Sequence, residues 1–305
     1  MVESKMMLQR TRSLQPNTLW QLIQDRTLHA LNCGALQPIA TKYEFVEQAG
    51  IQFAVQVVPN LVRRDSSKQQ DAPKINPGKS FNPFLPYEPD LFIADISETH
   101  LCLLNKFNVV DHHFLIVTRS FEDQETPLTL EDFEAVWQCL AELDGLVFYN
   151  SGKLAGGSQR HRHLQMVPLP FASENFPLPI APAIAQAQFT DGIGTVSTFP
   201  FAHAIVRLDS DWVESPIVAA KQTLVRYHRL LDTISLIQPN ASQLGAYNLL
   251  ATREWMLIIP RIHACFESIS VNALGFAGAI LVGDEPQLQR LKQSNPMAVL
   301  KAVSA

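Results

Sequence analysis

The sequence predicts an α+β fold built on an antiparallel sheet. Strand-like and helix-like segments are mixed along the 305 residues, without the regular β–α–β rhythm of a parallel, doubly wound sheet. Two apolar runs at residues 247–251 and 255–259 are separated only by Thr252–Glu254, which is typical of paired strands. The chain carries no repeat of the solenoid type, so a stacked repeat architecture is excluded.

The first third of the chain predicts one helix, one strand and one long loop. Asn17 is a candidate N-cap for a helix that runs towards Gly34, a residue that favours a helix end. Apolar and polar residues alternate over Ile51–Val57, which predicts a half-buried strand closed by Pro59. Residues 64–90 lose all periodicity and contain five prolines, so we expect a long surface loop that is partly mobile.

The middle of the chain predicts four strands and one helix. The strand-like runs are at residues 101–107, 113–117, 146–149 and 160–167. Thr129 and Asp132 have the spacing of a capping box, so a helix is expected to begin there. Its apolar positions follow helical spacing: Leu130, Phe133, Val136, Trp137 and Leu140.

The last third predicts a strand at residues 201–208 and a long helix that opens at Ser215–Pro216. A segment rich in Pro and Ala separates these elements from the earlier ones. We therefore divide the chain into an N-terminal region 1–170, a linker 171–199 and a C-terminal region 200–305.

Composition excludes several classes of function. The formal net charge of −5 argues against broad nucleic-acid binding, which needs a basic surface. No run of apolar residues is long enough for a membrane span, and no secretory signal is visible, so we expect no membrane partner. The four cysteines form no Cys-x-x-Cys pair, which favours reduced thiols in a cytoplasmic protein over a zinc knuckle or redox motif.

One stretch, residues 149–168, suits a phosphate ligand. His161, His163 and Gln165 are spaced i, i+2 and i+4, so on a strand their side chains share one face. The small residues at 155–158 let backbone N–H groups approach an anion, and Ser158 adds a hydroxyl donor.

The same stretch is free of acidic residues. No Asp or Glu lies between Asp144 and Glu174, whereas the interval holds Lys153, Arg160 and Arg162. An acid-free window in an acidic protein suits a phosphate ligand. Two other interpretations stay open: hydrogen-bonded surface residues, or a metal pair. The metal pair is less favoured because no acidic or cysteine third ligand lies nearby in sequence.

The residue types restrict the chemistry. A neutral histidine whose other N–H donates to a backbone carbonyl can attack phosphorus and form a phosphoramidate. A glutamine amide can donate to a phosphoryl oxygen but cannot act as a general acid or base. The reaction therefore needs a leaving group that departs without a proton, such as a polyphosphate.

On these residues the chain resembles the ATP adenylyltransferase (diadenosine tetraphosphate phosphorylase) family of the histidine-triad superfamily, in its His-x-His-x-Gln form. Further segments carry the resemblance in the family's order: VVPNLVRR ending at Arg64, NPFLPYEPDL from Asn82, LLNKFNVVDHHFLIVT from Leu103, VFYNSGKLAGGSQRHRHLQ ending at Gln165, PFAHAIVRL from Pro200 and YNLLATREWMLIIPR from Tyr247. The resemblance implies a histidine-triad-like antiparallel sheet flanked by helices, which the C-terminal half completes.

The resemblance also implies a double displacement. His163 would attack the α-phosphorus of diadenosine tetraphosphate, expel ATP and hold AMP, and inorganic phosphate would then take the AMP to give ADP. The partners would be dinucleoside polyphosphates, ATP, ADP and phosphate. No tightly bound cofactor is implied, and any magnesium would come with the nucleotide.

Carried over residue by residue, the family's site falls on catalytic and substrate-binding positions of this chain. The implied catalytic residues are His163, His161 and Gln165. The implied substrate-binding residues are Arg64, Asn105, Lys106, Asn150, Gly156, Gly157, Ser158 and Gln159. The chain departs from the family at Leu274, where a small hydroxyl residue is expected, and at Gly283, where a lysine is expected.

Three other functions fit part of the pattern. A hydrolase of dinucleoside polyphosphates would carry a third histidine where this chain has Gln165. A hexose-phosphate uridylyltransferase shares His-x-His-x-Gln but not the other segments. A nucleotide sensor would bind a dinucleotide without forming a covalent adduct.

Overall fold

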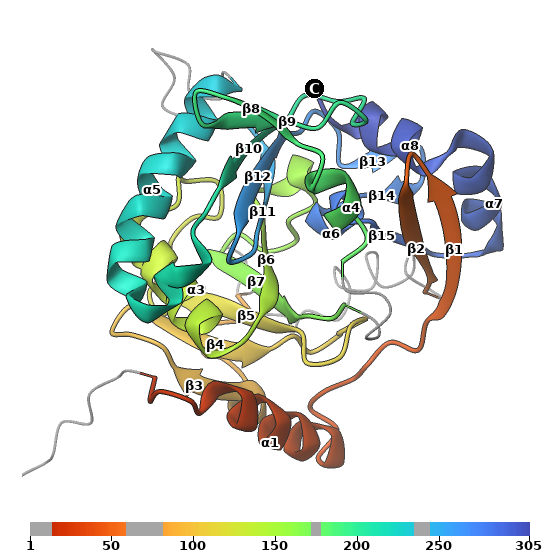
Figure 1. Cartoon of the computed structure of the whole chain (residues 1–305). Coiled ribbons are helices and arrows are strands. Elements are labelled where there is room, and N and C mark those ends of the chain that lie inside the picture. Colours follow the sequence, from red (N-terminus) through yellow and green to blue (C-terminus); the bar gives the residue numbers. More distant parts are fainter. Residues whose placement is uncertain (1–13, 59–81, 172–177, 235–244) are drawn as a thin grey trace, which may run out of the picture.

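A computed structural model describes residues 14–58, 82–171, 178–234 and 245–305. Its centre is a ten-stranded antiparallel sheet that runs through both halves of the chain (Figure 1). In spatial order its strands are β3 (Phe92–Asp95), β4 (His100–Leu104), β5 (Phe114–Thr118), β7 (His163–Pro168), β6 (Gly145–Asn150), β11 (Tyr247–Ala251), β12 (Trp255–Pro260), β10 (Ala204–Arg207), β9 (Ile193–Thr195) and β8 (Gln188–Thr190). The antiparallel pairing confirms the predicted fold class, and the C-terminal half completes the sheet where β11 pairs with β6.

Three helices cover one face of this sheet: α1 (Leu19–Asn32), α3 (Leu130–Glu142) and α5 (Pro216–Thr233). Figure 1 shows α3 and α5 side by side against the sheet. The predicted capping box is present, because the Thr129 side chain accepts the Asp132 N–H and the Asp132 carboxylate accepts the Thr129 N–H. The predicted helix start at Ser215–Pro216 is also confirmed, with Pro216 as the first residue of α5.

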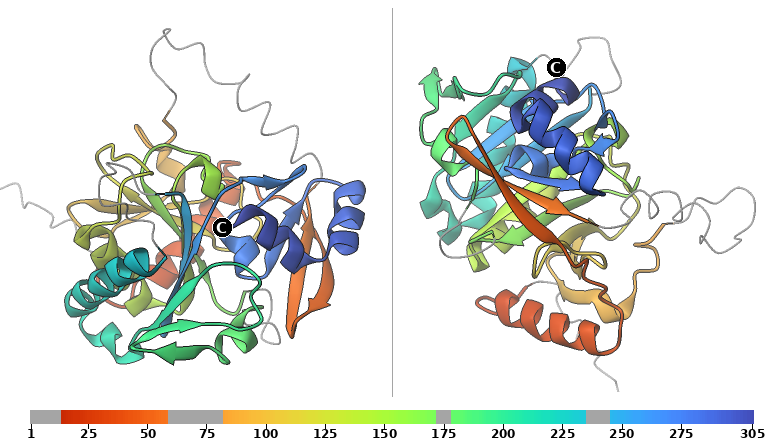
Figure 2. Two further views of the ribbon diagram at one scale, coloured as in Figure 1. Left: turned by 90° about the horizontal axis from the view of Figure 1, so that it is seen from above. Right: turned by 90° about the vertical axis from the view of Figure 1, so that its right-hand side faces the viewer.

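A second apolar core lies on the other face. It is enclosed by a three-stranded sheet and four helices: β1 (Lys42–Gln48), β2 (Ile51–Val57), β15 (Ala279–Val282), α4 (Ala181–Ile184), α6 (Ala273–Phe276), α7 (Glu285–Ser294) and α8 (Pro296–Val303). Figure 2 shows α7 and α8, in dark blue, beside the orange β1–β2 hairpin. A short hairpin of β13 (Cys265–Phe266) and β14 (Ile269–Ser270) leads into α6. The C-terminal elements of this core therefore pack against the sheet face formed in part by β6 and β7, the two strands joined by the loop within residues 149–168.

The first helix begins one residue later than predicted. Its N-cap is Thr18, whereas Asn17 has a φ of 60° and lies outside the helix. The free N–H groups at this end donate to the carboxylate of Glu142 on α3, at 2.8 Å from Asn17 and 2.9 Å from Thr18. A side chain from another helix therefore caps α1, which local sequence cannot reveal.

The strand predicted to be half-buried is buried on both faces. Gln56 belongs to the set of side chains that was expected to face solvent, and it is fully buried. β2 is the central strand of its sheet, between β1 and β15. Several other strands are shorter than predicted at one end. The clearest case is the 160–167 run, in which the regular strand begins only at His163.

The predicted linker at 171–199 is wrong for its described part. Residues 178–199 contain α4, β8 and β9, and the two strands extend the large sheet. Leu178, Ile180 and Ile184 are buried in the second core. Apolar residues spaced among the prolines bind this segment to the protein, so high Pro and Ala content did not mean a free linker here.

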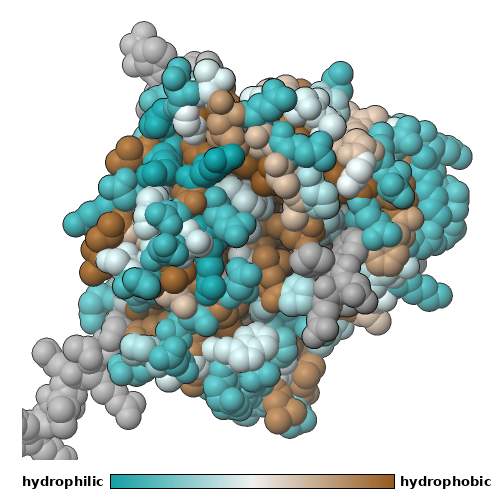
Figure 3. All heavy atoms as spheres, in the orientation of Figure 1, coloured by the Kyte–Doolittle hydropathy of each residue, from teal (hydrophilic) through white to brown (hydrophobic). Residues whose placement is uncertain are grey.

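The surface is mixed in character. On the face seen in Figure 3, hydrophobic residues gather near the middle and at the left-hand edge, and hydrophilic residues dominate the right-hand side. No helix within the described ranges has the length and apolar character needed to cross a membrane.

Candidate active site

His163 occupies the first position of β7 and is buried. Its Nδ1 atom lies 2.8 Å from the backbone oxygen of His161. Because a carbonyl can only accept, Nδ1 carries the proton and Nε2 keeps its lone pair. Burial lowers the pKa of His163 to about 4, so the ring is neutral at pH 7. This is the tautomer that a histidine nucleophile requires.

His161 precedes β7 and has both ring nitrogens engaged. Its Nε2–H donates to the backbone oxygen of Thr118 at 2.8 Å, so Nδ1 accepts from the side-chain amide of Asn82 at 2.9 Å. Burial lowers its pKa, although the bond to the Thr118 carbonyl opposes this shift. His161 is thus held firmly, and its backbone oxygen in turn orients His163.

Gln165 lies on the same face of β7 as His163 and is half-buried. Its Oε1 accepts from Nε2–H of His113 at 3.0 Å, and Nδ1 of His113 accepts from the Asn105 amide at 3.1 Å. Burial lowers the pKa of His113 to about 4, so this ring is neutral and can donate at one nitrogen and accept at the other. Because Oε1 is occupied by His113, the amide NH₂ of Gln165 is the part left to meet a ligand.

Gln124 is a buried side chain that joins the backbones of two strands at this point. Its amide nitrogen donates to the backbone oxygens of Asn150 at 2.9 Å and His163 at 3.1 Å. Its Oε1 accepts the backbone N–H of His163 at 2.8 Å. The backbone of His163 is therefore fixed by a side chain from the loop after β5, in addition to the sheet.

Residues of the C-terminal region hold the end of β6 and the loop between β6 and β7 by hydrogen bonds. Oδ1 of Asn150 accepts from the Asn248 amide and from the Ala273 N–H, both at 2.8 Å. Arg261 donates to Ala155 O at 3.3 Å and to Val271 O at 2.9 Å, and burial lowers its pKa to about 10. The side-chain oxygen of Asn150 is therefore used to hold the loop in place and is not free to meet a ligand.

The two loop glycines serve close packing more than anion binding. The N–H groups of Gly156 and Gly157 already donate within the loop, at 3.0 and 2.9 Å. Gly156 has a φ of +85°, and a Cβ there would lie 2.7 Å from Val271 O. These bonds do not favour the expectation that the two amides approach an anion, which stays a prediction. Within the described part of the chain, the N–H groups of Ser158 and Gln159 donate to no partner, so these two can meet a ligand.

The acid-free window in sequence is not acid-free in space. Arg160 pairs with Asp123 at 2.6 Å, and the buried Arg162 pairs with Asp132 at 2.9 Å and Glu122 at 2.7 Å. The side chain of Arg162 points to the face opposite His163, as the alternation of side chains along an extended chain requires, and its charge is neutralised there. Arg162 is therefore not available to a phosphate as the window suggested, whereas Arg160 is 78% exposed and makes only a surface ion pair.

The remaining predicted site residues are spread around the triad. Lys106 follows Asn105 after β4, and its ammonium group pairs with Glu88 at 2.7 Å. Ser158 is exposed and Gln159 half-buried at the loop end nearest His161. Arg64 lies outside the described residues.

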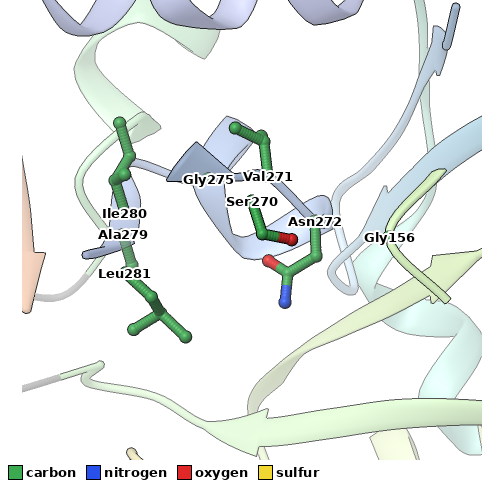
Figure 4. Close-up of a pocket in the computed structure, with 8 residues that line it drawn as sticks. All are labelled: Gly156, Ser270, Val271, Asn272, Gly275, Ala279, Ile280 and Leu281. Carbon is green, nitrogen blue, oxygen red and sulfur yellow. The ribbon is translucent and has the colours of Figure 1, made fainter. Parts of the chain in front are cut away.

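A small pocket of about 140 Å³ lies beside the loop, between Gly156 and β15 (Figure 4). Figure 4 shows the side chains of Ser270 and Asn272 with their oxygens close together and the Asn272 amide nitrogen reaching into the open space. Neither of the two departures from the family lines the pocket, although Leu274 is the neighbour in sequence of the lining residue Gly275. Leu274 is buried, and the N–H of Gly283 donates to Gln287 at 2.7 Å.

Sequence reasoning missed several residues that shape the site. His113 and Gln124 hold the triad from behind, and Phe84 packs its ring 5.3 Å from that of His163, centre to centre. All three lie about 40 to 80 residues before the triad. The only signal for His113 in the sequence was its place as the second of two adjacent histidines, at the start of the strand-like run 113–117.

Two family models together match most of the chain. Residues 9–186 match the Ap4A phosphorylase N-terminal domain, where Ap4A is diadenosine tetraphosphate. Residues 197–305 match the ATP adenylyltransferase C-terminal domain.

Individual known proteins are also similar to this chain over most of its length. Diadenosine 5',5'''-P1,P4-tetraphosphate phosphorylase 2 of Saccharomyces cerevisiae is 28% identical over 304 residues, with 90% of each chain covered. The crystal structure of yeast Ap4A phosphorylase Apa2 superposes with a TM-score of 0.77 at 23% identity, covering 95% of this chain and 98% of that one. Its complex with AMP superposes with a TM-score of 0.76 at 25% identity and the same coverage.

Proposed function

Because the chain belongs to the Ap4A phosphorylase family, we propose that it is a nucleotidyltransferase that cleaves diadenosine tetraphosphate with inorganic phosphate to give ATP and ADP. The observation that carries the proposal is the neutral, buried His163 with a protonated Nδ1 and a free Nε2. The reverse reaction, synthesis of diadenosine tetraphosphate from ATP and ADP, uses the same groups.

The reaction proceeds in two displacements. Nε2 of His163 attacks the α-phosphorus, the N–P bond forms, and the bond to the leaving ATP oxygen breaks with its electron pair. An oxygen of inorganic phosphate then attacks the same phosphorus, the N–P bond breaks, and ADP leaves. Neither leaving group requires a proton, which agrees with an amide rather than an acid at Gln165.

The substrate-binding set follows from the same geometry. The amide NH₂ of Gln165 and the N–H groups of Ser158 and Gln159 donate to phosphoryl oxygens. Asn105 and Lys106 contact the nucleotide beyond the triad. Magnesium arrives with the polyphosphate, because the imidazoles of the triad offer no oxygen and the one amide oxygen, Oε1 of Gln165, already accepts from His113. We also propose a cytoplasmic location, which the free state of all four cysteines supports.

Substitution of Gln165 by alanine is expected to lower kcat by about 100- to 1,000-fold, the usual effect of removing one aligned donor to a developing charge. Steady-state rates of ATP release measure it. The Gln289→Ala variant is the matched control, because Gln289 bonds only to Glu285 on the outside of α7. A kcat for Gln165→Ala within a factor of two of wild type would contradict the role of the amide.

The acid limb of the pH profile should lie unusually low. Only the neutral ring of His163 attacks phosphorus, and burial has lowered its pKa to about 4. Activity should therefore persist as the pH falls through 6.5, the ordinary value for histidine, and disappear only as the pH approaches 4. Initial rates at saturating and limiting substrate check this, and an acid limb centred near 6.5 would show that the nucleophile is not a buried histidine.

Product analysis tests the activity itself. Incubation with diadenosine tetraphosphate should yield ATP and ADP in equal amounts over many turnovers when phosphate is present, and no more than one equivalent of ATP per protein when it is absent. Release of AMP independent of phosphate would identify a hydrolase instead. Binding without any product would identify a nucleotide sensor.

A further inference from the structure

A separate cluster of metal-ligating side chains lies where α1 meets the short 3₁₀ helix η1 (Pro89–Leu91). The ligand atoms of His29, Cys33 and Asp90 all lie within 4.8 Å of one another. Nε2 of His29 is 2.8 Å from the Asp90 carboxylate and 4.0 Å from the Cys33 sulfur. The side chains of His29 and Asp90 are each about half exposed and Cys33 is exposed, so an ion can reach them from solvent.

The positions of these three residues in α1 and η1 allow their side chains to bind one ion together. His29 and Cys33 are spaced i, i+4 at the C-terminal end of α1, so both side chains project from one face. Asp90 comes from a different element and faces them. The C-terminal end of a helix carries partial negative charge, which favours a cation at this position.

We propose that His29, Cys33 and Asp90 bind a zinc ion, with water as the fourth ligand. One imidazole nitrogen, one thiolate and one carboxylate oxygen are the donor types that zinc accepts in tetrahedral sites. Tetrahedral zinc requires the 2.8 Å separation of His29 and Asp90 to lengthen and the 4.0 Å separation of His29 and Cys33 to shorten, each by roughly half an ångström. Binding releases the thiol proton of Cys33 to solvent, and the proton that His29 now shares with Asp90 is retained at Nδ1 of the neutral ring.

The site has a structural consequence for the triad. The chain segment before η1 contains Asn82, which bonds to His161, and Glu88, which pairs with Lys106. A bound ion would tie α1 to the start of η1, directly after this segment. The proposal is independent of the reaction assigned to His163, because it concerns metal binding alone.

Cobalt(II) provides the test, because it replaces zinc and reports a thiolate ligand by a charge-transfer absorption band. Protein freed of metal with a chelator and desalted should bind one equivalent of cobalt with this band, and zinc should remove it. Asp90→Asn should weaken cobalt binding by about tenfold, as loss of one ligand or its partner usually does.

The Cys33→Ser variant should lose the band, whereas the Cys265→Ser variant should keep it. Cys265 is the matched control, since it is the other exposed free cysteine in the described part of the chain. Zinc should also raise the melting temperature of the wild type and of Cys265→Ser but not of Cys33→Ser. Absence of the band in the wild type, or its persistence in Cys33→Ser, would overturn the proposal.

Discussion

Substitution of His163 by alanine is expected to lower the rate of phosphorolysis by about 1,000-fold or more, since loss of a nucleophile removes the covalent route entirely. The affinity for diadenosine tetraphosphate should change little, because the imidazole reacts with one phosphorus and the other groups that hold the polyphosphate remain. Single-turnover rates and equilibrium binding of the dinucleotide separate these two effects.

The chain offers a close control for this substitution. His203 also places Nδ1 at 2.8 Å from the backbone oxygen two residues before it, and burial also lowers its pKa. Its Nε2 accepts the N–H of Val196, so it has no free lone pair. His203→Ala should therefore retain phosphorolysis, and equal losses in both variants would point to a folding defect instead of chemistry.

The second large effect is on stability. Asp132→Ala is expected to lower the free energy of unfolding by about 3–5 kcal/mol, the usual cost of breaking a buried ion pair from one side. Asp132 is fully buried and bonds to His100 at 3.1 Å and to Arg162 at 2.9 Å, and it also closes the capping box of α3. Its removal leaves Arg162 buried with only the partly exposed Glu122 as a charged partner.

Denaturant unfolding measures this change, and Glu131→Ala on the exposed side of the same helix turn should cost only a few tenths of a kcal/mol. Burial by itself would raise the pKa of Asp132, but the His100 hydrogen bond and the Arg162 charge outweigh it and lower the pKa. The stabilisation is therefore present above the ordinary carboxyl pKa and is lost as the pH falls through the lowered one. An acid-unfolding midpoint unchanged in Asp132→Ala would contradict this account.

The part of the site carried by one strand was readable from sequence. His163 and Gln165 share a face because the period of a strand is two, and the structure places them so. The tautomer of His163 followed from chemistry and is borne out by the bond to the His161 carbonyl. Antiparallel pairing was predictable for a different reason. The runs at 247–251 and 255–259 are separated by only three residues, which is too short for a parallel crossover.

The parts set by long-range contacts were not readable. The sequence separation of Asp132 and Arg162 hid their pairing, so the acid-free window suggested a positive site that the fold neutralises. The support of Gln165 by His113 spans 52 residues, and the cap of α1 by Glu142 spans more than 120. The Gly156 backbone is shaped by Val271 in the C-terminal region, so the need for glycine there is one of packing.

Intact-protein mass spectrometry tests the central claim, the covalent histidine–AMP intermediate, most directly. Protein mixed with diadenosine tetraphosphate without phosphate and then desalted should gain the mass of one adenylyl group. Fragmentation at neutral or alkaline pH should place that group on His163, and added phosphate should remove it as ADP. His203→Ala should form the same adduct. An adduct that persists in His163→Ala, or no adduct on a wild-type protein that releases ATP and ADP, would contradict the assignment.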